Sequence, residues 1–140
     1  YQEQELGGLP VVRSVDFFGL TTVNPDDLGI GQVLEDALPY FDYIAPMIYP
    51  SHYAKGFIGF ANPAEHPYEV IKYSMDKAST RILAASSTPS QLRPWLQDFD
   101  LGADYTAELI KAQKKAVYDA GLTSWMMWDP SNHYTAGGLD

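Results

Sequence analysis

Residues 41–53 read FDYIAPMIYPSHY. The segment 44–48 (IAPMI) is apolar at successive positions, which is typical of a strand that is covered on both faces in a parallel sheet. Pro50 ends this strand, because proline has no N–H to donate to a neighbouring strand. A long loop rich in Tyr, Phe, Gly and Pro then runs to His66. Sites in α/β proteins commonly lie on such loops, so this stretch indicates both the fold and the place of the function.

Three other segments have the composition of strands, and apolar residues at helical spacing lie between them. The expected strands span residues 10–19, 43–49, 91–99 and 122–128. The expected helices span residues 30–38, 67–85 and 105–120, and residues 1–8 resemble the end of a further helix. Pro67 suits a first helical turn and Gly121 a left-handed cap. Strict alternation of strand and helix implies parallel strands joined by right-handed crossovers.

These elements predict the α/β fold class. A (β/α)8 TIM barrel has ~250 residues, so about four strands in a chain of 140 residues amount to half of such a barrel. Polar side chains at the strand ends also suit the mouth of a barrel. The chain has neither a GxGxxG nor a Walker pattern, which leaves a nucleotide-binding sheet without support. We expect residues 1–140 to form a single domain.

The composition excludes several classes of function. The chain has 18 acidic residues against 9 Lys and Arg, and a net charge of −9 argues against nucleic acids, anionic membranes and anionic polymers as partners. It has no Cys and no apolar run of membrane-spanning length. Its three His lack metal-binding spacing, so we expect no metal and no cofactor. A neutral ligand is favoured, and the aromatic content of 14% offers flat surfaces for it, unless these rings only pack their own loops.

The first residues bear on localisation. Residues 1–5 (YQEQE) are polar and acidic, with no initiator Met and no signal peptide. We therefore expect the chain to begin inside a longer protein or to be processed. The absence of Cys fits an exported bacterial protein, so we expect an extracytoplasmic location, either secreted or at the cell surface.

Five motifs occur in order along the chain: SVDFFGL (14–20), DYIAPMIYPSHY (42–53), NP and HPY (62–68), RPWLQDF (93–99) and WMMWDPSN (125–132). Together they resemble the C-terminal half of the putative glycosyl hydrolase domain family, DUF4015, which is related to glycoside-hydrolase-like TIM barrels. The resemblance covers the chain from Pro10 to Tyr134. It implies strands five to eight of a barrel truncated at its N-terminus, and a carbohydrate substrate. The family's upstream strand, with an Asp-Tyr-x-Arg-Phe-Pro type motif that supplies acidic groups, has no match here.

Glycoside hydrolysis usually needs two carboxyl groups, one as proton donor and the other as nucleophile or base. Asp16 is the first candidate, because alternation along residues 14–17 places it on the inner face of a strand near the barrel mouth. Arg93 from another strand is available as its partner, and the alternative is a purely structural Asp–Arg pair. Asp98 is a further catalytic candidate at a strand end, as is Asp129, although a capping or turn role is the alternative for both.

Tyr49 and His52 follow the central strand. Tyr49 is a catalytic candidate, since its hydroxyl could bond a sugar hydroxyl or stabilise a developing charge; the alternative is a buried tyrosine whose hydroxyl is satisfied by the protein. His52 is a substrate-binding candidate, although a single His in a loop is more often structural.

A sugar ring has an apolar C–H face and a rim of hydroxyl groups. Trp128, at the end of an expected strand, could cover the apolar face, and Trp95 could do so or belong to the core. Arg93, Gln97 or Asn132 could meet the hydroxyl rim. These five residues are therefore the other substrate-binding candidates.

Trp125 and Gln97 are expected to have their own partners. Trp125 lies on the opposite strand face from Trp128 by alternation, so we expect it to pack against a helix. Gln97 is polar on the inner face and must be bonded, either to a ligand or to Asp16.

The sequence thus favours half of a TIM barrel that performs acid/base hydrolysis of glycosidic bonds in a poly- or oligosaccharide, with Asp16 contributing. A second interpretation is a non-catalytic barrel that only binds glycans. A third is a different TIM-barrel hydrolase or lyase, because the fold does not fix the chemistry. In each case the half barrel would have two open sheet edges, through which we expect self-association.

Overall fold

The computed structural model describes residues 8–140, so the expected helix end over residues 1–8 lies outside the described part but for its last residue. In this range the strands are β1 Ser14–Phe18, β2 Tyr43–Met47, β3 Trp95–Gln97 and β4 Met126–Trp128. The α-helices are α2 Leu34–Ala37, α3 Pro67–Ala84, α4 Ala107–Asp119 and α5 Ala136–Leu139. Short 3-10 helices occur at η1 Gly19–Thr22, η2 Pro50–His52, η3 Phe57–Gly59, η4 Pro63–Glu65 and η5 Pro89–Gln91.

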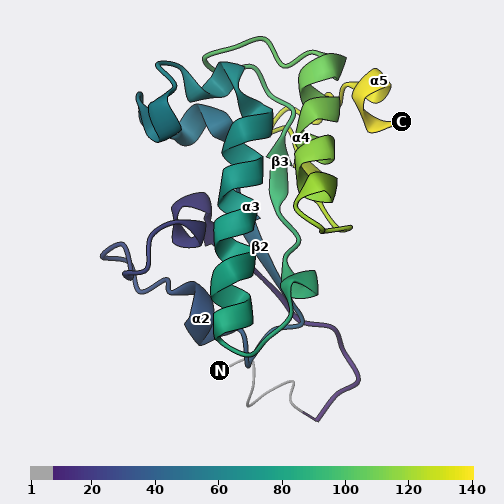
Figure 1. Cartoon of the computed structure of the whole chain (residues 1–140). Helices are drawn as coiled ribbons and strands as arrows, with labels where there is room; N and C mark the ends of the chain where they lie inside the picture. Colours follow the sequence, from purple (N-terminus) through teal and green to yellow (C-terminus); the bar gives the residue numbers. More distant parts are fainter. Residues whose placement is uncertain (1–7) are drawn as a thin grey trace.

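The four strands are parallel and lie in the order β1-β2-β3-β4. Helices α3 and α4 form the crossovers from β2 to β3 and from β3 to β4, and they lie side by side against the sheet (Figure 1). This confirms the predicted α/β class, with four parallel strands alternating with helices. The arrangement is compatible with half of a TIM barrel.

The paired strands are shorter than the sequence predicts. Pro46 has no N–H to donate toward β3, and β2 and β3 pair through one residue each, with one isolated bridge besides. Pro94 likewise has no N–H to donate toward β4, where its carbonyl oxygen accepts from Met126. The strands expected over 43–49 and 91–99 are therefore reduced to β2 and β3. Those expected over 10–19 and 122–128 are likewise present only in part, as β1 and β4.

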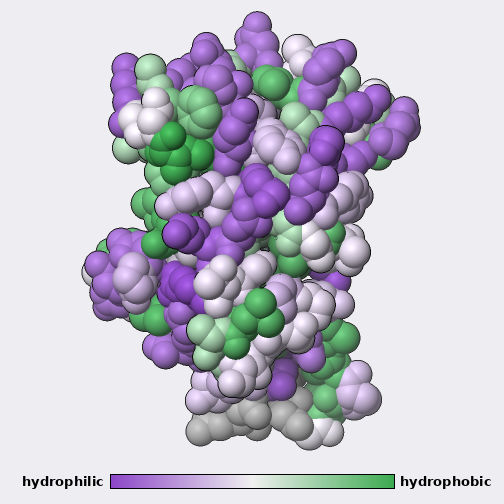
Figure 2. All heavy atoms as spheres, in the orientation of Figure 1, coloured by the Kyte–Doolittle hydropathy of each residue, from purple (hydrophilic) through white to green (hydrophobic). Residues whose placement is uncertain are grey.

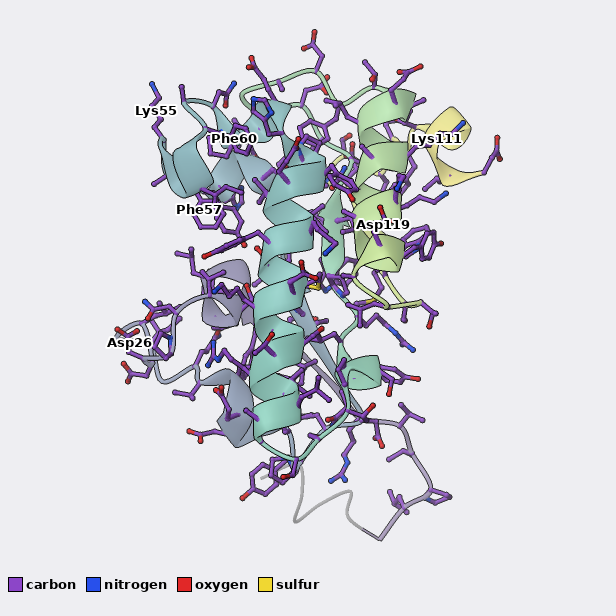
Figure 3. All side chains as sticks on the ribbon, viewed as in Figure 1. Asp26, Lys55, Phe57, Phe60, Lys111 and Asp119 are labelled. Carbon is purple, nitrogen blue, oxygen red and sulfur yellow. The ribbon has the colours of Figure 1, made fainter. Side chains whose placement is uncertain are left out.

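The helices expected over 67–85 and 105–120 are present as α3 and α4, but the helix expected over 30–38 is wrong in length. Gly31 has a φ of +74°, which an α-helix does not allow, so the loop before α2 extends into the expected helix. In this loop Asp26 and Asp27 each accept a hydrogen bond from the backbone N–H two residues further on, at 2.9 Å, which forms turns. Asp26 lies at the outer tip of this loop (Figure 3). Only the single turn α2 remains helical.

One face of the sheet forms the core with α3 and α4. Apolar side chains from alternate strand positions meet a row on α3 that has no exposed surface: Val70, Ile71, Met75, Ala78 and Ile82. Burying each large side chain of this row stabilises the fold by about 1.5–3 kcal/mol. The outer surface of α3 and α4 carries many hydrophilic side chains, as expected of amphipathic helices (Figure 2).

The opposite face of the sheet stays accessible. Val15 and Phe17 pack into the core, whereas Asp16 between them is exposed on the other side, as alternation predicts. Phe18 and Trp128 are 53% and 41% exposed. Within residues 8–140, β1 and β4 are the outer strands of the sheet, and self-association through these edges stays a prediction.

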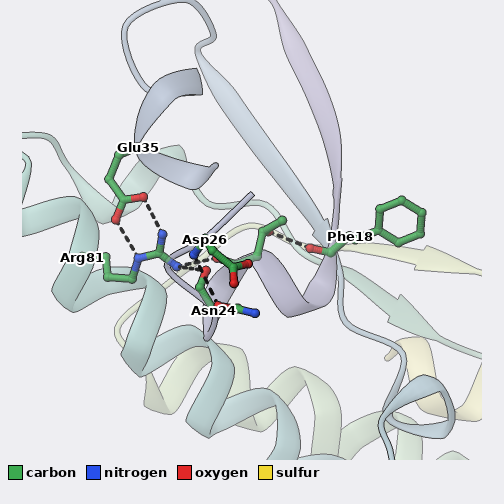
Figure 4. Close-up of polar contacts among 6 residues, drawn as sticks. Phe18, Asn24, Asp26, Glu35 and Arg81 are labelled. Atoms are coloured by element: carbon green, nitrogen blue, oxygen red, sulfur yellow. Dashed lines mark hydrogen bonds and ion pairs between the residues drawn. The ribbon is translucent and has the colours of Figure 1, made fainter. Parts of the chain in front are cut away.

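Arg81 of α3 fastens the loop between β1 and α2, residues 19–33 (Figure 4). Its guanidinium donates to both carboxylate oxygens of Glu35, at 2.6 and 2.5 Å. It also donates to the carbonyl oxygens of Thr21, at 2.5 Å, and Asn24, at 3.0 Å. The hydrogen bonds from Arg81 hold the pKa of Glu35 below its usual value, so this carboxylate stays ionised. One side chain thereby ties both ends of the loop to α3.

Two further contacts fix where this loop leaves the sheet. The N–H of Phe18 donates to Gln32 Oε1 at 2.8 Å, which holds the end of β1 against the end of the loop. Gly19 lies so close to β2 that a Cβ there would be 2.5 Å from the Met47 carbonyl oxygen. A side chain at position 19 would therefore push the loop off the sheet.

Replacing Arg81 with Ala is expected to lower the free energy of unfolding by about 2–3 kcal/mol, because Glu35 and two backbone carbonyls lose their charged donor. Urea denaturation followed by circular dichroism measures the change. Lys72→Ala on the same helix is the matched control. Lys72 pairs with Asp76 on a partly exposed face, and its loss should cost about 0.5 kcal/mol or less. Equal losses in the two variants would contradict the role given to Arg81.

Candidate functional site

Side chains from β1, β3 and β4 meet on the uncovered face of the sheet. Trp95 Nε1 donates a hydrogen bond to Asp16 Oδ1 at 2.9 Å, which links β3 to β1 across β2. The rings of Trp95 and Trp128 meet edge to face, with centroids 6.0 Å apart. We call Asp16, Trp95 and Trp128 the open-face site. It places an exposed carboxylate next to an exposed indole ring.

The predicted pairing of Asp16 with Arg93 is wrong. Arg93 Nε donates to Ser124 Oγ at 2.6 Å, and its guanidinium lies over the ring of Tyr43 at 3.6 Å from the centroid. Arg93 precedes β3, and its backbone N–H bonds Ile44 in the first half of β2, so its long side chain lies nearer the beginning of the strands. The structure therefore does not bring Arg93 to the open-face site.

Trp125 has the environment that alternation predicts. It packs against the core, and its Nε1 donates to the Tyr118 hydroxyl of α4 at 2.9 Å. The ammonium group of Lys114, also on α4, lies 5.3 Å from the ring centroid. Trp125 is thus a contact between β4 and α4, and Trp128 is the tryptophan of β4 that faces outward.

Tyr49 lies just beyond β2 in an aromatic cluster. Its ring meets those of His52 and Phe99 edge to face, each at a centroid distance of 5.4 Å. Burial, followed by the nearby charges of Asp16 and Tyr134, raises the pKa of Tyr49 to about 12. The phenol therefore stays protonated at neutral pH and can donate a hydrogen bond. His52 is exposed at the edge of the cluster.

Gln97 is wholly buried, and the protein itself satisfies its side chain. Its Oε1 accepts from the backbone N–H of Ser51, at 3.3 Å, and from the Ser51 hydroxyl, at 2.9 Å. Its Nε2 donates to the Phe99 carbonyl oxygen at 2.9 Å. Neither alternative from the sequence, a ligand contact or a bond to Asp16, matches these partners. Gln97 instead holds the loops that carry Tyr49 and Phe99.

Asp98 is almost fully buried at the end of β3. Its Oδ2 accepts from the backbone N–H of Thr135 at 2.7 Å, so it anchors the segment after β4. Its Oδ1 is buried and has no hydrogen-bond partner within residues 8–140. This geometry matches the anchoring alternative better than a carboxylate presented to a substrate, although Asp98 also lines a small cavity of about 420 Å³.

Asp129 has the turn role that its place before Pro130 predicts. Its Oδ1 accepts from both the backbone N–H and the hydroxyl of Ser131, each at 2.6 Å. These bonds lower the pKa of Asp129, so it is ionised at neutral pH and unsuited to donate a proton. Asn132 follows in this turn with a φ of +59° and an exposed side chain. It lies at the same end of the sheet as Trp128.

A pocket of about 760 Å³ lies at the ends of β1 and β2. Tyr49 and His52 line it, and the sequence predicted both as site residues. Its apolar walls include Leu20, Leu28 and Ile30, which the sequence analysis did not identify. The residues lie on the loop 19–33, where no helical or strand period indicates which side chains point inward. The only available signal was the alternation of apolar residues with glycine over residues 28–31.

Other rings near the site confirm the alternative that loop aromatics pack their own loops. Phe57 packs on Tyr53, at a centroid distance of 4.5 Å, and Phe60 stacks on His66 at 3.9 Å. Phe57, labelled in Figure 3, also meets the ring of Tyr73 on α3 edge to face, at a centroid distance of 5.8 Å. In the described part of the chain, no three His, Asp or Glu side chains gather as a metal site. No helix within residues 8–140 is both long and apolar enough to cross a membrane.

A family model described as a putative glycosyl hydrolase domain, DUF4015, matches residues 1–134. A search of curated proteins finds no match to this chain.

Replacing Gln97 with Met keeps the side-chain length but removes the bonds to Ser51 and Phe99. We expect the free energy of unfolding to fall by about 1–3 kcal/mol, because buried polar groups lose their partners. Ser51→Ala is the matched control: it removes a single hydroxyl donor and should cost about 1 kcal/mol or less. Urea denaturation followed by tryptophan fluorescence measures both. A Gln97→Met variant as stable as the parent would show that Gln97 does not hold the loops.

Proposed function

This chain belongs to the putative glycosyl hydrolase domain family, and from that premise we propose that it takes part in acid/base hydrolysis of glycosidic bonds in a poly- or oligosaccharide. The observation that carries the proposal is the hydrogen bond from Trp95 Nε1 to Asp16 Oδ1, at 2.9 Å, beside the exposed ring of Trp128. The indole N–H fixes the orientation of a carboxylate on a face that stays accessible. An oriented carboxylate is the group that glycoside hydrolysis requires.

Asp16 acts as one of the two carboxyl groups of the reaction. The second carboxyl group is not that of Asp129, because Ser131 donates hydrogen bonds to Asp129 Oδ1 and holds its pKa low. It is not Asp98 either, because that side chain is buried and anchors Thr135. The second carboxyl group is supplied from outside the described residues, as the resemblance to the family implies. The chain itself acts as a single domain, strands five to eight of the barrel.

The sugar ring stacks on Trp128, which offers a flat apolar surface to its C–H face. Tyr49 donates a hydrogen bond to a sugar hydroxyl or to charge that develops on an oxygen, because its raised pKa keeps the phenol protonated. His52 and Asn132 are exposed at the same end of the strands and contact the hydroxyl rim. Trp95 positions Asp16, and Gln97 positions the loop of Tyr49.

A specific observation favours a second function, glycan binding without catalysis. Of the three aspartates at the strand ends, Asp16 alone is exposed, whereas Asp98 and Asp129 are held by structural hydrogen bonds. One carboxylate suffices for binding but not for two-carboxylate hydrolysis. In either case the partner is a neutral carbohydrate, which fits a protein of net charge −9. We infer that the protein lies outside the bacterial cytoplasm, secreted or at the cell surface, because the absence of Cys fits an exported protein.

Asp16→Asn in the gene product that carries this sequence tests the catalytic role. With poly- and oligosaccharides as substrates, we expect the release of reducing ends to fall by roughly 10²–10⁴-fold, while binding of the same glycans persists. Asp36→Asn, at an exposed site on α2, is the control and should leave turnover unchanged. Unchanged turnover in the Asp16 variant would remove Asp16 from the mechanism.

Trp128→Ala tests the sugar platform and separates the two functions. Loss of the stacking surface should weaken glycan binding about tenfold by isothermal calorimetry, which corresponds to about 1.4 kcal/mol. Tyr40→Ala removes an equally exposed ring at the other end of the strands and should have no effect. Binding that depends on Trp128, together with no turnover of any glycan that binds, would favour the non-catalytic function.

A further inference from the structure

An apolar pocket lies beside the open-face site. The pocket of about 760 Å³ is formed by the ends of β1 and β2, by η1 and by the loop 19–33. Its volume lies in the range of small-molecule sites, roughly 300–1,000 Å³. Hydrogen bonds from Arg81 and to Gln32 fasten the loop that forms one wall of the pocket.

The chemistry of the lining is apolar and uncharged. Phe18, Leu20, Leu28, Ile30 and Met47 supply most of its side chains. Within residues 8–140, the lining includes no Asp, Glu, Lys or Arg. In a chain of net charge −9, a pocket of this size without a single carboxylate disfavours cations and strongly polar groups as occupants. The side chains therefore select a hydrocarbon or aromatic group.

The polar groups of the pocket lie at the side that faces the sheet. The Tyr53 hydroxyl is turned into the core, where it lies 3.3 Å from Ser74 Oγ, so it offers no polar group to the pocket. Tyr49 and His52 remain, and Tyr49 is protonated at neutral pH. An occupant would thus meet hydrogen-bonding groups at one end only.

The pocket and Asp16 share one strand. Phe18 lies two residues after Asp16 on the same face of β1, which separates their backbone positions by about 7 Å. Phe18 on β1 lies opposite Met47 on β2, and Met47 lies opposite Trp95 on β3. Because Phe18 and Met47 line the pocket, the pocket adjoins the Asp16–Trp95 hydrogen bond. Trp128 lies on the far side of that bond, on β4. A spacing of this size is also close to the width of one sugar ring.

From this arrangement we propose that the pocket binds an apolar aglycone, an alkyl or aryl group attached to the sugar that stacks on Trp128. The glycosidic bond then lies at Asp16, between the two surfaces. This inference rests on the proposed function and narrows its substrate to a saccharide that carries a hydrocarbon group. A substrate made only of sugars would place hydroxyl groups against Leu20, Leu28 and Ile30, where they would lose their hydrogen bonds to water.

A neutral fluorescent probe, N-phenyl-1-naphthylamine, reports occupancy of the pocket. It is displaced with matched pairs of n-octyl and methyl β-D-glycosides of glucose, galactose and N-acetylglucosamine, below the micellar concentration, with 1-octanol as the chain alone. We expect each octyl glycoside to bind at least tenfold more tightly than its methyl partner. For at least one sugar, the octyl glycoside should also bind more tightly than 1-octanol.

Ile30→Asp puts a charge into the pocket from an exposed loop position and should remove most of the octyl preference. Leu20→Asp puts a charge into the pocket from η1, where Leu20 is 45% exposed, and serves if the first variant is unstable. Leu83→Asp, at a position on α3 that is 61% exposed, is the matched control and should bind as the parent does. Melting curves of all variants confirm that they are folded.

Three results would overturn the assignment: equal affinity for octyl and methyl glycosides, an octyl preference that survives both pocket variants, and 1-octanol binding as tightly as every octyl glycoside. Failure of the hydrolase function gives a different pattern. In that case Asp16→Asn leaves turnover unchanged, or no glycan is cleaved. The protein still prefers octyl glycosides, and Ile30→Asp still removes this preference.

Discussion

The buried row of α3 is the constraint on which the rest of the structure depends. The strands alone are held weakly: they have three to five residues each, and prolines remove one donor from β2 toward β3 and one from the start of β3 toward β4. What keeps the strands in one sheet is the hydrophobic core that they share with α3 and α4, in which the inward side chains of α3 are completely buried. Hydrogen bonds from side chains add to this, since Gln113 of α4 accepts from the Gln97 N–H, at 2.9 Å, and donates to its carbonyl oxygen, at 2.7 Å.

Because α3 and α4 occupy one face, the other face is where chemistry can occur. The pleat sends alternate residues to opposite sides, so each strand supplies both the core and the site. Val15 and Phe17 stabilise the fold, and Asp16 between them lies exposed on the accessible face. At β4, Trp125 packs against the core just before the strand, and Trp128 at its end is exposed on the other face. A carboxylate on this face needs an orienting partner, and Trp95 provides it from a strand that does not touch β1.

The fold was largely predictable from the sequence, because long segments with a regular apolar spacing indicate the type and position of each helix and strand. The apolar spacing over residues 67–85 and 105–120 predicted α3 and α4, and alternation predicted which side of β1 carries Asp16. The partner of Asp16 was not predictable. Alternation gives the face of a strand but not the direction of a long side chain, and Arg93 turns back to Tyr43 while Trp95 reaches across. The pocket was missed because the loop 19–33 has no period, and its path depends on Arg81, far away in sequence.

The way this loop is fastened bears on how the protein can change over time. Arg81 grips its backbone at Thr21 and Asn24, and Gly19 fixes its exit from β1, so the attachment depends little on which side chains lie in between. Leu28 and Ile30 belong to the pocket but not to the core. Substitutions or short insertions over residues 25–31 can therefore accumulate at small cost to folding. New ligand preferences could arise here by mutational drift while the sheet, the helices and Asp16 stay as they are.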